Sequence, residues 1–553
     1  MDRIDFQKGK RKILKVIFGR TVVLFLSLII QFAVLIFFFV KLSEYLGYYY
    51  GVGIIISVIL LIYIVNSDEN PSYKLAWGIP VALMPVFGSL FYLFVHIQPY
   101  RRIINNRLEE INYHTAGYMK QDPMVLQELE EKDIQVKHFV DYMNRVGPFP
   151  VCKNSDAKFY PLGDDWYPDM LKRLKEAKEF IFIEFFIVNY GELWDSVLEI
   201  LKQKAKEGVE VRFMYDGTCT FFRLPHNYPE YLGKMGIQCR VFSPIRPALS
   251  TYQNNRDHRK IVVIDGKVAY TGGVNLADEY INRIERFGHW KDTAVELTGE
   301  VVNSFTMLFL QNWNITSKPT EDVSKYIRSY KVESEGYIMG YTDSPFDHVE
   351  VGEAVYMDIL NTAKHYVHIM TPYLILDNEM ITSLAYAANR GIDVKIIMPH
   401  ITDKPYAYIV ARNYYEILLK KGIRIYEYEP GFIHAKEFIS DDCKAVVGSV
   451  NMDYRSLYLN FECAAYLYQV NAVHDAEKDF QKLAACCKEK GIEDAVHAVA
   501  SVNETLGYAA YTLDIYGQVD SGQTEWFEQL MKAAPCEVQY KGSVAYDQSV
   551  AVI

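Results

Sequence analysis

A duplicated motif, His-x-Lys-x-x-x-x-Asp, constrains the fold of this chain more than any other feature of its sequence. The motif residues are His258, Lys260 and Asp265 in the first copy and His434, Lys436 and Asp441 in the second. The same order of segments precedes each copy: an apolar strand-like run, a helical stretch and a second apolar run. A further apolar run and a turn of small residues that closes with Asn follow each copy. An internal repeat of this length predicts two copies of one domain.

Short β-rich apolar runs alternate with helical stretches from about residue 150 onward. This alternation is typical of an α/β sheet with helices on its faces. We therefore predict two duplicated α/β/α domains, at 150–320 and 321–484, that form one active site about a pseudo-twofold axis. At 553 residues the chain is long enough for further domains. The sequence indicates no role for the C-terminal extension, 485–553.

The first 98 residues are predicted to form a membrane segment with about three transmembrane helices. Residues 21–40 contain no charged side chain, and a helix of about 20 residues spans the hydrocarbon layer of a bilayer. Two further apolar stretches follow at 51–65 and 75–95. A cleaved signal peptide is the alternative for the first stretch, but no small-residue cleavage site follows it. The charged, helix-prone residues 99–149 are expected to connect this segment to the catalytic domains.

The charges around the apolar stretches give two conflicting indications of orientation in a cell membrane. The basic residues that precede residue 21 favour a cytoplasmic N-terminus. Three crossings from that start would place the catalytic domains outside the cytoplasm. Arg101, Arg102 and Arg107 directly follow the last stretch and favour the opposite side. The sequence therefore predicts a multi-pass protein of the cell membrane. It favours the extracytoplasmic side for the catalytic domains and leaves the cytoplasmic side open.

Composition excludes several classes of function. Lys and Arg number 58 against 69 Asp and Glu, which gives a formal charge of −11, whereas nucleic-acid binding relies on clustered positive charge. A nucleic-acid partner is therefore not expected. The eight cysteines form no Cys-x-x-Cys pair and have no His at metal-binding spacing, so neither a zinc site nor a disulfide framework is indicated. We predict no metal and no cofactor.

The motif itself indicates chemistry on a phosphate. A His and a Lys two residues apart on a strand project from the same face, so both can reach one ligand. Lysine supplies a positive charge for a phosphate oxygen, and imidazole can act as nucleophile or proton donor near neutral pH. The turns after the two motifs add small residues and amide side chains as candidate phosphate ligands. These candidates are Gly273, Asn275, Ser449 and Asn451.

A histidine that attacks phosphorus is usually held in the right tautomer by a carboxylate on its other ring nitrogen. Each repeat offers one carboxylate downstream of its histidine, Asp292 in the first and Glu462 in the second. We interpret both as histidine-orienting residues, and the alternative is a surface carboxylate at the end of a strand. The motif acids Asp265 and Asp441 are expected to fix the local turn of the chain rather than to touch the substrate.

The paired motifs resemble those of the phospholipase D superfamily, and the resemblance covers about residues 150–480. Several segments are similar to bacterial cardiolipin synthases in particular. They are NPSYKLAWGIPVALMPVFGSLFYLF, YDGTCTFFRLP, NNRDHRKIVVIDGKVAYTGGVNLADEY, HWKDTAVEL and TPYLILDNEM.

The resemblance implies a phosphatidyltransferase that converts two molecules of phosphatidylglycerol to cardiolipin and glycerol at a bilayer. It implies that His258 attacks the phosphodiester to form a phosphatidyl-histidine, while His434 protonates the departing glycerol. Lys260 and Lys436, with Asn275 and Asn451, would stabilise charge on the phosphate oxygens. Neither a metal nor CDP-diacylglycerol would be needed.

Three other functions are compatible with parts of the sequence. A phospholipase D that hydrolyses, or that exchanges other headgroups, would use the same motifs with a different acceptor. A membrane-anchored nuclease is disfavoured by the acidic composition. A non-catalytic scaffold is disfavoured because His and Lys are intact in both repeats. The acceptor lipid and the oligomeric state have no readable signature in the sequence.

Overall fold

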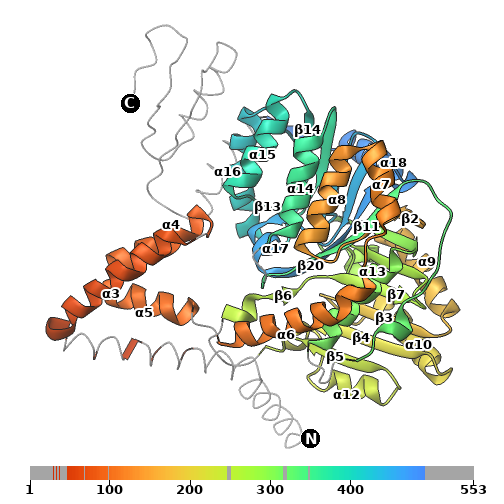
Figure 1. Ribbon diagram of the computed structural model, residues 1–553, viewed down its shortest axis with the longest axis horizontal. Coiled ribbons are helices and arrows are strands. Elements are labelled where there is room, and N and C mark those ends of the chain that lie inside the picture. Colours follow the sequence, from red (N-terminus) through yellow and green to blue (C-terminus); the bar gives the residue numbers. More distant parts are fainter. Residues whose placement is uncertain are drawn as a thin grey trace, which may run out of the picture.

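The computed structural model describes residues 46–67, 69–96, 99–245, 251–315, 321–346 and 349–491, with isolated positions between 29 and 41. Its catalytic part consists of two β-sheets, one from each half of the chain, with helices between them and on their outer faces (Figure 1). Helices α3, α4 and α5 lie to one side of this body.

The first sheet has seven strands in the order β2-β10-β8-β7-β3-β4-β5. Strands β3, β4 and β5, which end at one edge of the sheet, are parallel, and the remaining neighbours are antiparallel. In chain order the strands are β2 (Ser155–Tyr160), β3 (Phe180–Phe185), β4 (Glu210–Asp216), β5 (Gln238–Phe242), β7 (Lys260–Ile264), β8 (Val268–Gly272) and β10 (Ala294–Gly299). Every residue of β3 is buried, as expected for a strand covered on both faces.

The second sheet repeats this order as β11-β20-β18-β17-β12-β14-β15, so each strand of the first sheet has a counterpart. Its strands are β11 (Tyr337–Asp343), β12 (Tyr366–Met370), β14 (Asp393–Pro399), β15 (Arg424–Tyr428), β17 (Glu437–Ser440), β18 (Lys444–Gly448) and β20 (Asn460–Tyr468). Two edge strands extend it, β1 (Val151–Cys152) beside β11 and β21 (Lys488–Lys490) beside β15. The duplicated α/β fold predicted from the sequence is confirmed.

The two sheets share one apolar layer. Helices α13 (Val302–Asn314) and α18 (Asn471–Ala484) lie in equivalent places after β10 and β20. Each packs against both sheets: α13 contacts β7, β8 and β11, and α18 contacts β2, β17 and β18. Side chains of both sheets therefore form one continuous core with α13, which is buried along its whole length. The halves are joined as a single body rather than as two loosely linked domains.

Helices on the outer faces complete the layers. They are α9 (Gly163–Glu176), α10 (Glu192–Lys206), α11 (Cys219–Phe222) and α12 (Tyr228–Gly233) in the first half. In the second half they are α14 (Val351–Thr362), α15 (Asn378–Asn389), α16 (Pro405–Lys420) and α17 (Tyr454–Tyr458). Separate apolar clusters fill the spaces under the two outer layers.

The boundaries of the second domain differ from those predicted. Helices α6 (Pro99–Thr115), α7 (Pro123–Lys132) and α8 (Ile134–Val146) were expected to be a connecting linker. Instead α7 and α8 bury apolar side chains in the outer core of the second sheet, and the Phe139 ring lies 4.9 Å from that of Tyr466. Strand β21 likewise lies within the predicted extension, 485–553, but belongs to the second sheet. The sequence of an amphipathic helix or of a short charged strand does not show which sheet the element packs against, so these contacts were not predicted.

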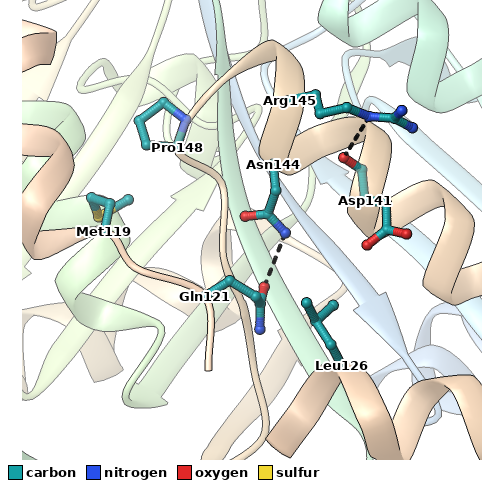
Figure 2. A pocket seen from close by; sticks show the side chains of 7 residues that line it. All are labelled: Met119, Gln121, Leu126, Asp141, Asn144, Arg145 and Pro148. Atoms are coloured by element: carbon teal, nitrogen blue, oxygen red, sulfur yellow. Dashed lines mark hydrogen bonds between the residues drawn. The ribbon is translucent and has the colours of Figure 1, made fainter. Parts of the chain in front are cut away.

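A shallow hollow of about 550 Å³ lies beside these connecting helices and contains none of the motif residues (Figure 2). Its lining residues are Met119, Gln121, Leu126, Asp141, Asn144, Arg145 and Pro148. Across it, Asn144 Nδ2 donates to Gln121 Oε1 at 3.2 Å, and Gln121 in turn accepts from the Val151 amide at 2.8 Å. The hollow thus marks where the chain enters the second sheet.

The N-terminal helices are α3 (Leu46–Asn66), α4 (Pro71–Leu83) and α5 (Pro85–His96), and the three pack against one another. Of the helices that the structure describes, none is both long and apolar enough to cross a membrane. The spans predicted at 51–65 and 75–95 are therefore not borne out. The stretch 75–95 divides between α4 and α5 at Pro85, because proline lacks the amide hydrogen that a continuing helix needs. The span predicted at 21–40 lies almost entirely outside the described residues.

Candidate active site

Two short pairs of parallel strands join the halves at the motif histidines. Strand β6 (Arg256–Asp257) pairs with the first residues of β20, and β16 (Gly431–Ile433) pairs with β9 (His289–Lys291). The next residue of each pair extends the contact, because the His258 amide donates to the Phe461 carbonyl at 2.9 Å. The His434 amide donates to the Lys291 carbonyl at 2.7 Å. Each histidine is thereby fixed beside a strand of the opposite half.

The carboxylates that orient the histidines come from the opposite repeat. His258 Nδ1 lies 2.9 Å from both carboxylate oxygens of Glu462, and His434 Nδ1 lies 2.6 Å from Asp292 Oδ2. All four side chains are buried. The structure supports an orienting position for Asp292 and Glu462, but the pairing within each repeat that chain order implied is wrong. The strand pairs explain the exchange, since Glu462 follows Phe461 and Asp292 follows Lys291.

The turn residues Gly273 and Ser449 support these carboxylates. A Cβ atom on Gly273 would lie 2.0 Å from Asp292 Oδ1, so only glycine leaves room for that carboxylate. At the equivalent place in the second repeat, Ser449 Oγ donates to Glu462 Oε2 at 2.5 Å. Asn460 Nδ2 also donates to Glu462, at 3.2 Å. We expected Gly273 and Ser449 to bind the substrate phosphate, and the structure instead gives them positions behind the orienting carboxylates.

The two turn asparagines differ from each other. Asn275 uses both ends of its amide inside the protein: Oδ1 accepts from the Ile187 amide at 2.9 Å and Nδ2 donates to the Tyr280 hydroxyl at 2.9 Å. These bonds give Asn275 a role in holding Tyr280, and phosphate binding by Asn275 stays a prediction. Asn451 is buried, and its Oδ1 has no hydrogen-bond partner among the described residues. Phosphate binding by Asn451 stays a prediction.

Both motif lysines are buried next to the histidines. Lys260 Nζ donates to the His258 carbonyl at 2.5 Å, and Lys436 Nζ donates to the His434 carbonyl. Lys436 Nζ also lies 2.9 Å from His434 Nδ1. Each lysine is close enough for its positive charge to lower the pKa of both histidines. The two histidines, the two lysines and the two orienting carboxylates therefore form one electrostatic unit.

The motif aspartates fix turns, as the sequence predicted. Asp265 has a left-handed backbone, with φ of 53°, and its carboxylate accepts three backbone amides of residues 178–180 at 2.7–2.9 Å. Asp441 has φ of 54° and accepts the equivalent amides of residues 364–366 at 2.7–2.9 Å. Each aspartate lies at the end of its motif strand away from the histidine. They tie the turn to the start of the next strand in the sheet and do not face the site.

Aromatic residues that the sequence analysis did not assign enclose the histidines. The Phe186 ring centroid lies 4.9 Å from that of His258, and Tyr280 and Trp290 lie 5.3 and 5.6 Å from His434. Phe186 directly follows β3, and Tyr280 follows the turn asparagine of the first repeat. Apolar runs of this kind are indistinguishable from core in a sequence, which is why they were missed.

A buried ionic network lies behind His258. Arg259, the variable residue of the first motif, contacts Glu184 at 2.6 Å and Asp257 at 3.2 Å. Asn312 of α13 donates to both of these carboxylates. The network anchors the backbone on both sides of His258 to the central helix. Among the described residues, no group of His, Cys, Asp or Glu could hold a metal ion.

Comparison with known proteins shows where this arrangement occurs. Residues 170–308 and 356–484 match the family described as "Cardiolipin synthase, PLD-like domain", and residues 55–95 match "Phospholipase D-nuclease N-terminal". "Cardiolipin synthase 2" of Bacillus anthracis is 34% identical over 423 residues, which cover 75% of this chain and 81% of that protein. The chain belongs to the cardiolipin synthase family.

A second sequence relative and a similar solved structure were also found for this cardiolipin synthase family member. An uncharacterized protein of Streptococcus mutans is 48% identical over 423 residues, which cover 76% of this chain and 92% of that protein. Among solved structures, phosphatidylserine synthase of Haemophilus influenzae is similar with a TM-score of 0.49 and 15% identity. That match covers 61% of this chain and 87% of that chain.

The two half-sites of this cardiolipin synthase family member differ electrostatically. Burial alone would raise the pKa of Glu462, but the charge and hydrogen bond of His258, with help from Lys260 and Ser449, hold it below its ordinary value. In the described part of the chain Asp292 has no such hydroxyl or amide side-chain donor, and burial raises its pKa to about 7. Burial lowers the pKa of His258 to about 4. The Glu462 carboxylate is thus ionised at neutral pH, whereas the Asp292 carboxylate takes up a proton near pH 7.

Substitution of Gly273 tests how tightly the Asp292 carboxylate is held. Gly273→Ala places a methyl group on Asp292 Oδ1, so we expect the free energy of unfolding to fall by about 2–4 kcal/mol. Gly233→Ala is the matched control, because nothing lies within 4 Å of its added Cβ, and it should change stability by less than about 1 kcal/mol. Denaturant titration of both variants measures the difference. Equal stabilities would show that Asp292 is not fixed against this turn.

Proposed function

We propose that this protein is a cardiolipin synthase, which transfers a phosphatidyl group from one phosphatidylglycerol to another and releases glycerol. The observation that carries the proposal is the exchange of carboxylates: two histidines from two repeats are each held by a carboxylate of the other, beside two buried lysines. This arrangement provides one nucleophile, one proton donor and two cations for a single phosphodiester. The identity of 34% with "Cardiolipin synthase 2" supports the choice of substrate.

In the first step His258 is the nucleophile. Its Nδ1–H donates to the ionised Glu462, which leaves Nε2 with its lone pair. Nε2 has no protein partner among the described residues. Nε2 attacks phosphorus, the bond from phosphorus to the glycerol oxygen breaks, and a phosphatidyl-histidine forms. The departing oxygen takes a proton from His434, whose pair with Asp292 retains one near neutral pH.

In the second step the roles of the acid and base reverse. His434 accepts the proton from a headgroup hydroxyl of a second phosphatidylglycerol, and that oxygen attacks phosphorus. The phosphorus–nitrogen bond breaks, which frees His258 and releases cardiolipin. Lys260 and Lys436 stabilise the negative charge on the phosphate oxygens in both steps. Water at the place of the second lipid would give phosphatidic acid, so the alternative function is hydrolysis or exchange of another headgroup.

We also propose that the protein acts at a membrane surface. Its substrates are lipids, and residues 55–95 match an N-terminal family segment found with phospholipase D-type proteins. Helices α3, α4 and α5 expose large apolar side chains. Examples are Ile55, Ile59, Ile62, Leu75, Ile79 and Leu83. An exposed apolar surface of this kind fits contact with lipid.

Lipid mass spectrometry tests the proposed reaction directly. We expect purified protein with phosphatidylglycerol alone to yield cardiolipin and glycerol, and His258→Ala and His434→Ala to yield neither. Phosphatidic acid without cardiolipin would identify water as the true acceptor and the protein as a phospholipase. Activity retained in either histidine variant would contradict the two-histidine mechanism.

A substrate with an activated leaving group separates the roles of the two histidine–carboxylate pairs. Phosphatidyl-p-nitrophenol needs no proton to release its alcohol, so Asp292→Asn should lower glycerol release about 100-fold or more yet leave p-nitrophenol release nearly intact. Glu462→Gln should slow both, because it weakens the nucleophile itself. The measurement is the amount of glycerol or p-nitrophenol released in the first turnover on the corresponding substrate. The reverse pattern would make His434 the nucleophile.

The rate should decline as the pH rises above neutrality. Burial lowers the pKa of Lys436 to about 7 and that of Lys260 to about 8, and the proton of the His434–Asp292 pair is lost near pH 7. Rising pH therefore removes both the acid and the positive charge, and kcat/KM with phosphatidylglycerol should fall. In Lys436→Arg the guanidinium keeps its charge, so the fall should become shallower. A profile that is flat up to pH 9 would contradict this assignment.

A further inference from the structure

The proposed second step brings a negative charge that the groups described so far do not bind. Lys260 and Lys436 lie at the phosphate that is transferred. The acceptor phosphatidylglycerol carries a phosphate of its own, one glycerol away from the hydroxyl that gives its proton to His434. The glycerol that leaves in the first step is neutral and has no such charge. A cation that binds the acceptor should therefore lie on the His434 side of the site, outside the motif lysines.

The loop 400–404 lies at this place. It joins β14 to α16, at the carboxyl end of a parallel strand. The Ile401 amide donates to the Gly431 carbonyl at 3.3 Å, and Gly431 begins β16, which ends directly before His434. The side chain of Ile401 also lies beside the cross-domain strand pair. Its Cδ1 is 3.1 Å from the place that a Cβ atom on Gly288 would occupy. The loop is thus fixed to the strand that carries the proton-transferring histidine.

Lys404 is the cation of this loop, and a second set of contacts fixes it. Lys404 Nζ donates to the Tyr373 hydroxyl at 2.7 Å and lies 4.2 Å from the centre of that ring. The Tyr373 carbonyl accepts from Thr371 Oγ1 at 3.0 Å. The same Thr371 oxygen accepts the amide of Met452, the residue after Asn451, at 3.1 Å. Lys404 is therefore held between the His434 strand and the turn of the second motif.

The ammonium group of Lys404 remains open to a ligand. Its side chain is 45% exposed, and it forms a long ion pair with Asp403 Oδ2, at 3.8 Å and beyond hydrogen-bond distance. That carboxylate oxygen instead accepts the Tyr373 hydroxyl at 2.7 Å. An ammonium group has three N–H donors, and Tyr373 takes one. The charge of Lys404 also acts within the site. Burial lowers the pKa of His434 and raises that of Asp453, and the charge of Lys404 adds to the first shift and opposes the second.

We propose that Lys404, positioned by Tyr373, binds the phosphate of the acceptor lipid and so selects an anionic lipid with a headgroup hydroxyl. This inference rests on the proposed function, because it assigns the acceptor of that reaction. Phosphatidylglycerol satisfies both requirements, whereas a zwitterionic lipid would place its own ammonium group near Lys404. The phosphate of the product that came from the acceptor would remain on Lys404 until release.

The test separates the two steps in Lys404→Gln, with Lys404→Arg as the charge-conserving variant. On phosphatidylglycerol vesicles we expect glycerol release in the first turnover to be retained within about twofold. Cardiolipin formation should fall about 10- to 100-fold, the loss expected when a charge-assisted hydrogen bond is removed. The stalled phosphatidyl group should pass to water as phosphatidic acid. Lys404→Arg should restore most of the cardiolipin.

Lys421→Gln is the matched control, because this exposed lysine follows the other end of α16. It should leave both products unchanged, and vesicle co-sedimentation of each variant checks that membrane binding is equal. An equal loss of glycerol release and cardiolipin in Lys404→Gln would overturn the proposal, as would no loss of either. If the wild-type protein gives phosphatidic acid and no cardiolipin, the proposed function itself fails, and the acceptor site fails with it.

Discussion

The exchange of carboxylates between the two histidines is the interaction on which the rest of the site depends. Each half of the chain supplies a histidine to a carboxylate of the other half, so neither half contains a complete catalytic pair. One parallel strand pair beside each histidine sets this geometry through backbone hydrogen bonds. The two halves must therefore be rigidly joined. Helices α13 and α18, each packed against both sheets, provide that rigidity.

Small differences between the repeats give two similar half-sites different chemistry. Ser449 and Asn460 donate to Glu462, whereas Gly273 offers Asp292 only room. A buried carboxylate with several donors stays ionised, and one with few donors takes up a proton. The first pair is consequently suited to hold a neutral histidine for attack on phosphorus. The second is suited to give and take a proton.

The repeat made the fold and the motif residues predictable from the sequence. The equal order of apolar runs around each motif predicted equivalent strands. The turn-fixing role of Asp265 and Asp441 followed from their place after a strand. The exchange of Asp292 and Glu462 could not be predicted, because chain order does not show which half a strand pairs with. The supporting positions of Ser449 and Asn275 could not be predicted for a related reason. A polar side chain in a turn can face the substrate or support a neighbour, and only the packing decides.

The charges of the site favour an anionic phosphodiester as its ligand. Lys260 and Lys436 are positive and Glu462 is negative, while the His434–Asp292 pair, which retains its proton, adds no charge. With both lysines charged, the unit carries one positive charge in excess, which is unfavourable in a low-dielectric interior. Burial is accordingly the main cause that lowers the pKa of both lysines. A bound phosphodiester brings one negative charge and removes the excess. Since the transferred phosphate uses up that charge, a second lipid phosphate requires a separate cation. The exposed position of Lys404 outside the buried unit matches this requirement.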